Sequence, residues 1–197
     1  MLSLSRRAVA AAFVVGLALQ APSFAQGRDF HDQDLAGRNF ANQRLDGADF
    51  SGANLAGANF TGASLRGANF QEAILKNTNF SHSNCSNCDF RKSEGPFFQA
   101  SDSSSRTNFS NANFEGLDMK KASMFKANLS GANLRDTTNW GDMFGVYMRG
   151  ADVSGANFLS MSSGGMANGN IFAGVYYSDD TSFPSSIDPV AQGARKK

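Results

Sequence analysis

The sequence predicts an all-β solenoid, a fold in which the chain winds repeatedly through one short structural unit. The first observation is a large apolar residue or Cys85 at every fifth position from Phe30 to Phe90. Twelve of these thirteen positions alternate strictly between Phe and Leu. A period of five fits neither the turn of a helix nor the alternation of a strand over such a length. The second observation is a narrow composition, with 18 Phe, 20 Gly and one Trp, which is typical of a repeat protein.

The N-terminal segment 1–25 differs from the rest of the chain and predicts a signal peptide. It contains no acidic residue, and the paired Arg6 and Arg7 precede an apolar run over 8–19. This run is too short to span a bilayer comfortably. The small residues Ser23 and Ala25 then predict cleavage after Ala25. An N-terminal anchor that is never cleaved is the alternative.

Two export routes are compatible with this segment. The paired arginines before an Ala-rich stretch resemble a twin-arginine signal, which delivers a folded protein. Paired arginines also occur in ordinary secretory signals, so general secretion is favoured. With either route we expect a periplasmic or otherwise exported protein without stable membrane insertion after cleavage.

The charge of the expected mature chain is close to neutral. The whole chain has 18 basic and 17 acidic residues and a formal net charge of +1. Loss of Arg6 and Arg7 with the signal leaves 16 basic against 17 acidic residues, a net charge of −1. The total therefore predicts neither a polybasic nucleic-acid groove nor a strongly acidic surface, and no nucleic-acid partner is expected.

Each five-residue unit has a regular order of residue types. We call the large residue the centre. The residue two before it, the small position, is usually Ala, and the residue one before it is usually Asn or Asp. In an extended backbone, side chains two apart share a face. The centre and the small position therefore point inward, and the Asn or Asp between them points to water.

This pattern resembles the pentapeptide-repeat family, whose consensus is A(D/N)LxX, and the resemblance covers nearly the whole mature chain. It implies a right-handed quadrilateral β-helix over residues 26–177, with four pentapeptides to each coil and about seven coils. In that geometry two Phe ladders face each other across the core. They consist of Phe30, Phe50, Phe70 and Phe90 on one side, and Phe40, Phe60 and Phe80 on the opposite side.

Beyond Phe90 the phase of the repeat slips. The separation between Phe90 and Phe109 is one residue short of four pentapeptides, and so is that between Leu134 and Val153. We interpret both as irregular coils or small bulging loops, with an exposed excursion expected over residues 91–106. The later centres are expected at Phe109, Phe114, Met119, Met124, Leu129, Leu134, Met143, Met148, Val153, Phe158, Met166, Ile171 and Tyr176. An interaction surface is expected where the pattern fails, and its candidates are Arg91, Lys92, Phe97, Phe98, Arg106 and Trp140.

The two ends of the solenoid lead to different expectations. Residues 178–197 break the repeat, and their Thr-x-Phe-Pro and Asp-Pro motifs resemble the ending of some family members. We expect this capping segment and tail to cover the last coil, whose strand edges would otherwise be exposed. Repeats begin almost directly after Ala25, so the first coil is predicted to be uncapped. Self-association at this first coil is therefore a hypothesis.

Cys85 and Cys88 form a C-x-x-C pair in which both side chains are predicted to point into the core. Two small apolar fillers are the favoured interpretation, and a buried disulfide is the alternative. A working redox pair is disfavoured because an inward thiol is inaccessible. His82 completes H-x-x-C-x-x-C but is predicted to point outward, so no metal site is expected.

Neither catalysis nor a cofactor is supported by the remaining residues. Methionines can bind copper through their thioethers. However, Met119, Met124, Met143, Met148 and Met166 occupy predicted centres and are expected to be core residues. His31 and His82 both occupy predicted outward positions, and no acid–base pair stands out. The sequence therefore predicts a protein that is not an enzyme.

Three classes of function remain. The favoured one is a structural or protein-interaction role with an unknown protein partner or with other copies of the chain. The resemblance also implies an alternative, because some family members mimic a DNA duplex and bind topoisomerases. The export signal and the near-neutral charge disfavour this alternative. Ice binding would require regular ranks of Thr on one side, and the residues that follow successive centres form no such rank.

Overall fold

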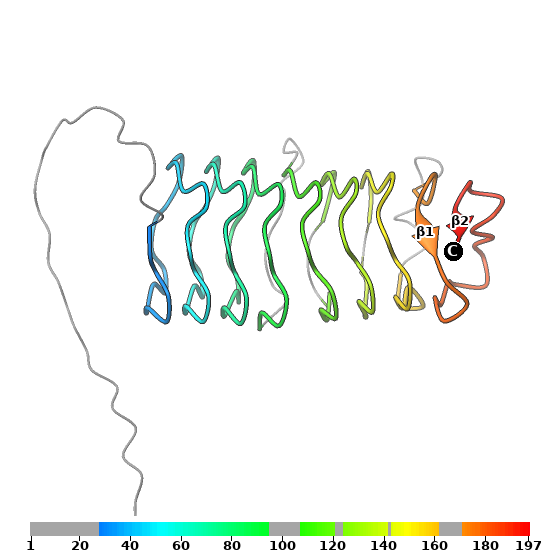
Figure 1. Ribbon diagram of the computed structural model, residues 1–197, viewed down its shortest axis with the longest axis horizontal. Coiled ribbons are helices and arrows are strands. Elements are labelled where there is room, and N and C mark those ends of the chain that lie inside the picture. Colours follow the sequence, from blue (N-terminus) through cyan, green and yellow to red (C-terminus); the bar gives the residue numbers. More distant parts are fainter. Residues whose placement is uncertain (1–27, 95–106, 121–123, 142, 162–170) are drawn as a thin grey trace, which may run out of the picture.

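The computed structural model describes residues 28–94, 107–120, 124–141, 143–161 and 171–197. The chain forms a rod of stacked coils (Figure 1), a right-handed quadrilateral β-helix of about seven coils. Parallel bridges connect residues one coil apart, as between Asp49 and Asn69 or between Asn54 and Ile74. Within the described part of the chain, no helix is long and apolar enough to cross a membrane.

Backbone hydrogen bonds connect each coil with the next. The N–H of Phe50 donates to the carbonyl of Asn69 at 2.8 Å, and the N–H of Asn69 donates back to the carbonyl of Ala48 at 3.0 Å. Each pentapeptide thus exchanges bonds with the equivalent pentapeptide of the following coil. Most bridges are single, and the described residues contain two strands of two residues each, β1 (Tyr176–Tyr177) and β2 (Arg195–Lys196).

The corner between two sides is a tight turn after each centre. The N–H of Ala53 donates to the carbonyl of Phe50 at 3.0 Å. The residue two after the centre has a left-handed backbone, as at Gly52 with φ +67° and Asn77 with φ 57°. Gly and Asn tolerate this conformation better than other residues do. Gly52 also lies tightly above Asp32, because a Cβ at Gly52 would be 2.1 Å from Asp32 Oδ1.

The two predicted Phe ladders are confirmed. The rings of Phe50 and Phe70 stack with centroids 5.0 Å apart and an interplanar angle of 5°. Phe60, from the opposite ladder, meets Phe50 edge to face at 5.3 Å and 82°. Both arrangements are favourable for aromatic pairs. The small positions are also buried as predicted, with Ala48, Ala53, Ala58, Ala63, Ala68 and Ala73 at most 1% exposed.

The slip after Phe90 is an insertion, which agrees with the expectation of an irregular coil in this stretch. Phe114, and not Phe109, stacks on Phe90, with centroids 4.8 Å apart. Phe109 follows Asn108, which bridges to Asn84 with a separation of 24 in the sequence. The coil is therefore longer than a regular one by four residues, and they fall between Glu94 and Thr107.

The second slip is a coil one residue short, as predicted. Asn133 bridges to Asp152, so Leu134 and Val153 take equivalent places in successive coils. The last two predicted centres, Ile171 and Tyr176, are wrong by one residue. Asp152 bridges to Tyr176, which lies four positions beyond the partner that a regular coil would supply. This second insertion places Phe172 and Tyr177 at the centres.

Residues 178–197 lie on the last coil at the C-terminal end of the rod (Figure 1). β1 and β2 pair in parallel, with Tyr176 opposite Arg195. Within the same segment, the ring of Phe183 stacks on that of Phe158 at 5.7 Å. The segment thus supplies both backbone partners and an apolar cover to the final coil.

Candidate interaction surface

The predicted surface residues are only partly where the sequence placed them. Arg91 and Lys92 are exposed and follow the buried centre Phe90. Phe97, Phe98 and Arg106 lie outside the described residues.

Trp140 is not a surface residue, and this prediction is wrong. It is 1% exposed, its Nε1 donates to Thr137 Oγ1 at 2.9 Å, and its ring stacks on that of Phe158 at 5.5 Å. The cause is the missing residue in this coil. Asn139, at the expected centre position, is exposed and has φ 56°, so Trp140 supplies the inward side chain instead.

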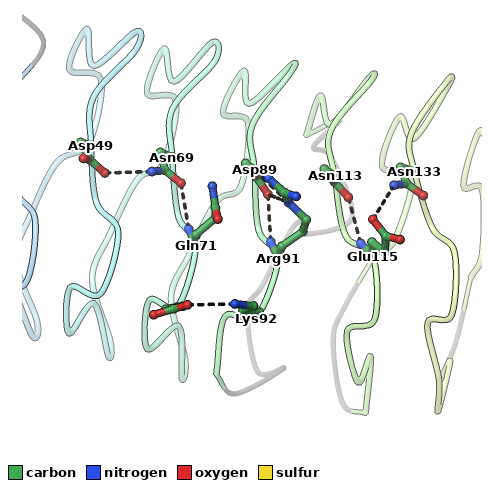
Figure 2. Close-up of polar contacts among 10 residues, drawn as sticks. Asp49, Asn69, Gln71, Asp89, Arg91, Lys92, Asn113, Glu115 and Asn133 are labelled. Atoms are coloured by element: carbon green, nitrogen blue, oxygen red, sulfur yellow. Dashed lines mark hydrogen bonds and ion pairs between the residues drawn. The ribbon is translucent and has the colours of Figure 1, made fainter.

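Arg91 lies on the side of the rod that is built on Phe30, Phe50, Phe70, Phe90 and Phe114. Figure 2 shows the polar residues of this side in a rank along the rod. Asn69 Nδ2 donates to Asp49 Oδ1 at 3.1 Å, and Asn69 Oδ1 accepts the backbone N–H of Gln71 at 3.1 Å. These residues precede and follow the centres of successive coils. The turn geometry and the bonds between coils therefore fix their side chains.

This side carries an excess of carboxylates, and we call it the acidic side. Arg91 donates to Asp89 at 2.7 Å, and Lys92 lies 3.3 Å from Glu72 (Figure 2). These two cations neutralise only part of the negative charge. The acidic residues of its described pentapeptides are Asp29, Asp32, Asp49, Glu72, Asp89, Glu115, Asp136, Asp152 and Asp179, against Arg28, Arg91, Lys92 and Arg135. Lys196 and Lys197 of the C-terminal segment also pair with Asp179 and Asp152, so nine carboxylates face six cations.

Two carboxyl groups of the acidic side have lowered pKa values. The Ser51 hydroxyl donates to Asp49 at 2.6 Å and holds the pKa of that carboxyl below its ordinary value. Burial acts to raise the pKa of Asp152. Hydrogen bonds from Lys197 at 2.6 Å and Ser154 at 2.7 Å outweigh burial, so the pKa of Asp152 is also lowered.

The lowered pKa values predict a loss of stability in acid. The unfolded chain takes up protons at a higher pH than these folded carboxyls do. Their contribution is therefore complete above the ordinary Asp pKa of about 3.9 and is lost as the pH falls through the folded values. We expect Asp152→Asn to be less stable than the wild type at pH 7 and the gap to narrow toward pH 3 in urea unfolding. A gap that stays constant with pH would contradict this assignment.

Cys85 and Cys88 are joined by a disulfide, so the favoured interpretation of two unbonded apolar fillers is wrong and the alternative, a buried disulfide, is present. Both residues are at most 1% exposed, as predicted for a centre and a small position. Cys88 Sγ lies 3.1 Å from the Leu65 carbonyl oxygen. Hydroxyls at other small positions donate to the corresponding carbonyls, as Thr78 does to Leu55 at 2.9 Å. A reduced Cys88 thiol would therefore have an acceptor in place.

We expect reduction to leave the fold intact. The disulfide links residues three apart, and so short a loop contributes no more than about 2 kcal/mol through chain entropy. Urea unfolding with and without a phosphine reductant measures the difference, and mass spectrometry under denaturing conditions verifies the redox state. Loss of the β-solenoid signal in circular dichroism on reduction would show a larger role for the bond.

The described residues offer no metal site. They contain no group of three or more His, Cys, Asp and Glu side chains that could hold a metal ion. His31 and His82 are both exposed, as predicted. Met119, Met124, Met143 and Met148 are at most 1% exposed, which confirms them as core residues, and Met166 lies outside the described residues.

The structure also reveals an outward aromatic pair that the sequence analysis missed. Phe125 and Phe144 each follow a Met centre, and their rings stack at 5.1 Å and 10°. Lys126 Nζ lies 5.1 Å from the centroid of the Phe125 ring. Both rings are half-buried. The signal that could have found them is the position directly after the centre, which points outward.

Comparison with known proteins places the chain in a family. Pentapeptide-repeat models match in eight copies over residues 29–62, 58–94 and 105–138, just over half of the chain. Among curated proteins, none matches. A trypsin-treated form of QnrB1, a plasmid-mediated fluoroquinolone resistance protein, is 20% identical, with a TM-score of 0.49 and coverage of 87% of this chain and 89% of that one.

Two further solved structures are similar. A pentapeptide-repeat protein from the Arabidopsis thaliana thylakoid lumen is 28% identical, with a TM-score of 0.31 and coverage of 68% of this chain and 70% of that one. HetL, involved in heterocyst differentiation regulation in the cyanobacterium Nostoc sp. strain PCC 7120, is 17% identical, with a TM-score of 0.36 and coverage of 82% and 85%. The family assignment rests on the repeat matches, and this chain belongs to the pentapeptide-repeat family.

Proposed function

We propose that this chain is an exported, non-enzymatic solenoid that binds a protein partner through its acidic side. The observation that carries the proposal is the excess of carboxylates on one side of the rod, where Asp49, Asp89 and Glu115 lie among ordered amides in successive coils (Figure 2). The inward side chains fill the core, so the outward side chains are the groups available for binding. A partner with a basic surface of matching length complements the acidic side.

Export is supported by the signal-like segment 1–25 and by the Cys85–Cys88 disulfide, since disulfides persist in oxidising compartments. Cell fractionation and N-terminal sequencing test it, with Gln26 expected as the first residue of the exported form. If the chain is exported by general secretion, replacing Arg6 and Arg7 by Lys is expected to leave the amount of exported protein unchanged. A block of export by this replacement would instead establish the twin-arginine route.

The partner is sought by a pull-down from the exported fraction with a variant that neutralises the acidic side. Asp32, Glu72 and Asp136 have positive φ values of 55°, 60° and 57°, so we replace each by Asn, which tolerates this conformation. The variant Asp32→Asn/Glu72→Asn/Asp136→Asn is expected to lose the partner. Capture by the wild type is also expected to weaken in high salt, because salt screens exposed charges.

A matched control removes the same number of carboxylates from a neighbouring side. Asp34, Glu94 and Asp118 precede centre positions there, and we replace them as Asp34→Asn/Glu94→Gln/Asp118→Asn. This control has the same net charge as the first variant and is expected to keep the partner. Equal capture by both variants, or no specific partner at all, would refute the proposed surface.

The excess of carboxylates on the acidic side also supports a second candidate function, in which the protein mimics DNA and binds a topoisomerase. A supercoiling assay with purified gyrase distinguishes the two functions, and we expect no inhibition by this protein. Inhibition that increases with dose and is lost in the Asp32→Asn/Glu72→Asn/Asp136→Asn variant would favour the mimic. Retention of the chain in the cytoplasm would point the same way.

A further inference from the structure

The first coil differs from every later described coil at its four small positions. In the second coil these positions are Ala and are at most 1% exposed. In the first coil they are long and polar, namely Arg28, Gln33, Arg38 and Gln43. All four occupy the places where a core-facing alanine would otherwise lie. A change at every small position of one coil cannot come from a shift of the repeat, because the centres stay in phase.

Two of these side chains bond to the backbone at the edge of the coil. Gln33 Nε2 donates to the carbonyl of Asp29 at 3.1 Å, and Gln43 Nε2 donates to the carbonyl of Asn39 at 3.3 Å. In the second coil the equivalent carbonyl, that of Asp49, accepts the N–H of Phe30, a centre of the first coil, at 2.7 Å. The glutamine amides therefore donate to carbonyls that, in later coils, accept backbone N–H groups of the preceding coil.

A third contact connects two sides of the same coil. Arg28 Nη1 donates to Gln43 Oε1 at 3.1 Å. Gln43 thus accepts from a guanidinium while it donates to a backbone carbonyl. Of the centres next to these polar residues, Leu35, Phe40 and Leu45 are at most 7% exposed, and Phe30 is half-buried.

We propose that Arg28, Gln33, Arg38 and Gln43 form a polar end cap that closes the first coil against end-to-end stacking of a second copy of this chain. Stacking would remove two guanidinium groups and two amides from water, a cost that is large without new partners. It would also displace the amides that already occupy edge carbonyls. The proposal reverses the expectation of an uncapped first coil, and it is independent of the partner of the acidic side.

The test converts the first coil into the pattern of the second. The variant Arg28→Ala/Gln33→Ala/Arg38→Ala/Gln43→Ala is compared with the wild type by sedimentation velocity over a hundredfold range of concentration. The protein is used as purified, with its N-terminus determined by mass spectrometry. We expect the wild type to remain monomeric and the variant to form dimers or longer species whose share grows with concentration.

Two further variants keep the test decisive. Arg44→Ala/Lys76→Ala removes the same positive charge from sites outside the cap and is expected to remain monomeric. Gln33→Ala/Gln43→Ala leaves both arginines in place, and it serves as the test if the fourfold variant does not fold by circular dichroism. Self-association of the wild type through this end, or monomers for every folded cap variant, would overturn the proposal.

Discussion

Phe70→Ala is expected to lower the free energy of unfolding by about 3–5 kcal/mol. Phe70 is 0% exposed and stacks between Phe50 and Phe90, with centroids 5.0 Å away in each case. Phe80 of the opposite ladder meets it edge to face at 5.4 Å. Removal of this ring leaves a cavity that the bonded coils above and below cannot close without breaking their register.

Urea unfolding followed by circular dichroism measures this effect. Lys76→Ala, in the next pentapeptide of the same coil, is the control. Lys76 is exposed, so a change within about 0.5 kcal/mol is expected. A loss below about 1 kcal/mol in Phe70→Ala would mean that the ladder is dispensable and that the backbone bonds between coils maintain the fold.

Trp140→Ala is expected to cost a similar amount, about 3–5 kcal/mol, because its indole is buried against Phe158. Trp140→Phe keeps a ring in this place but loses the hydrogen bond to Thr137, so a smaller cost of about 1–2 kcal/mol is expected. A surface position would instead give a change near zero for both variants.

The wild type provides a second measurement at the same site. Trp140 is the only tryptophan of the chain, so its fluorescence reports on this coil alone. We expect emission at short wavelength that moves to longer wavelength on unfolding, and little quenching by iodide in the native state. Strong iodide quenching of the folded protein would contradict the burial of Trp140.

The sequence predicted the fold well where the large apolar centres recur at every fifth position without interruption. From Phe30 to Phe90 each centre is followed by the next at the fifth position, and the stacked rings follow that count. Beyond Phe90 a count along the chain cannot separate a short coil from three pentapeptides with an insertion of four residues, because both have the same length. The ring contact of Phe90 with Phe114 decides between them.

Because the sequence could not distinguish a short coil from an insertion, it also could not show which residues make up the acidic side. Glu115 belongs to the acidic side only when the insertion is known, so the rank from Asp49 to Asn133 could not be assembled from the sequence. Trp140 was misplaced because one missing residue exchanges inward and outward positions locally. Arg91 and Lys92 were found because they follow Phe90, the last centre of the uninterrupted count.

The four additional residues between Glu94 and Thr107 leave the register of the neighbouring layers unchanged. Asn84 bridges to Asn108 and Asp89 to Asn113 across the longer coil, so the layers above and below keep their alignment. A guest segment inserted into this stretch of the sequence is therefore expected to leave the stacked layers on both sides aligned, because four additional residues already do so.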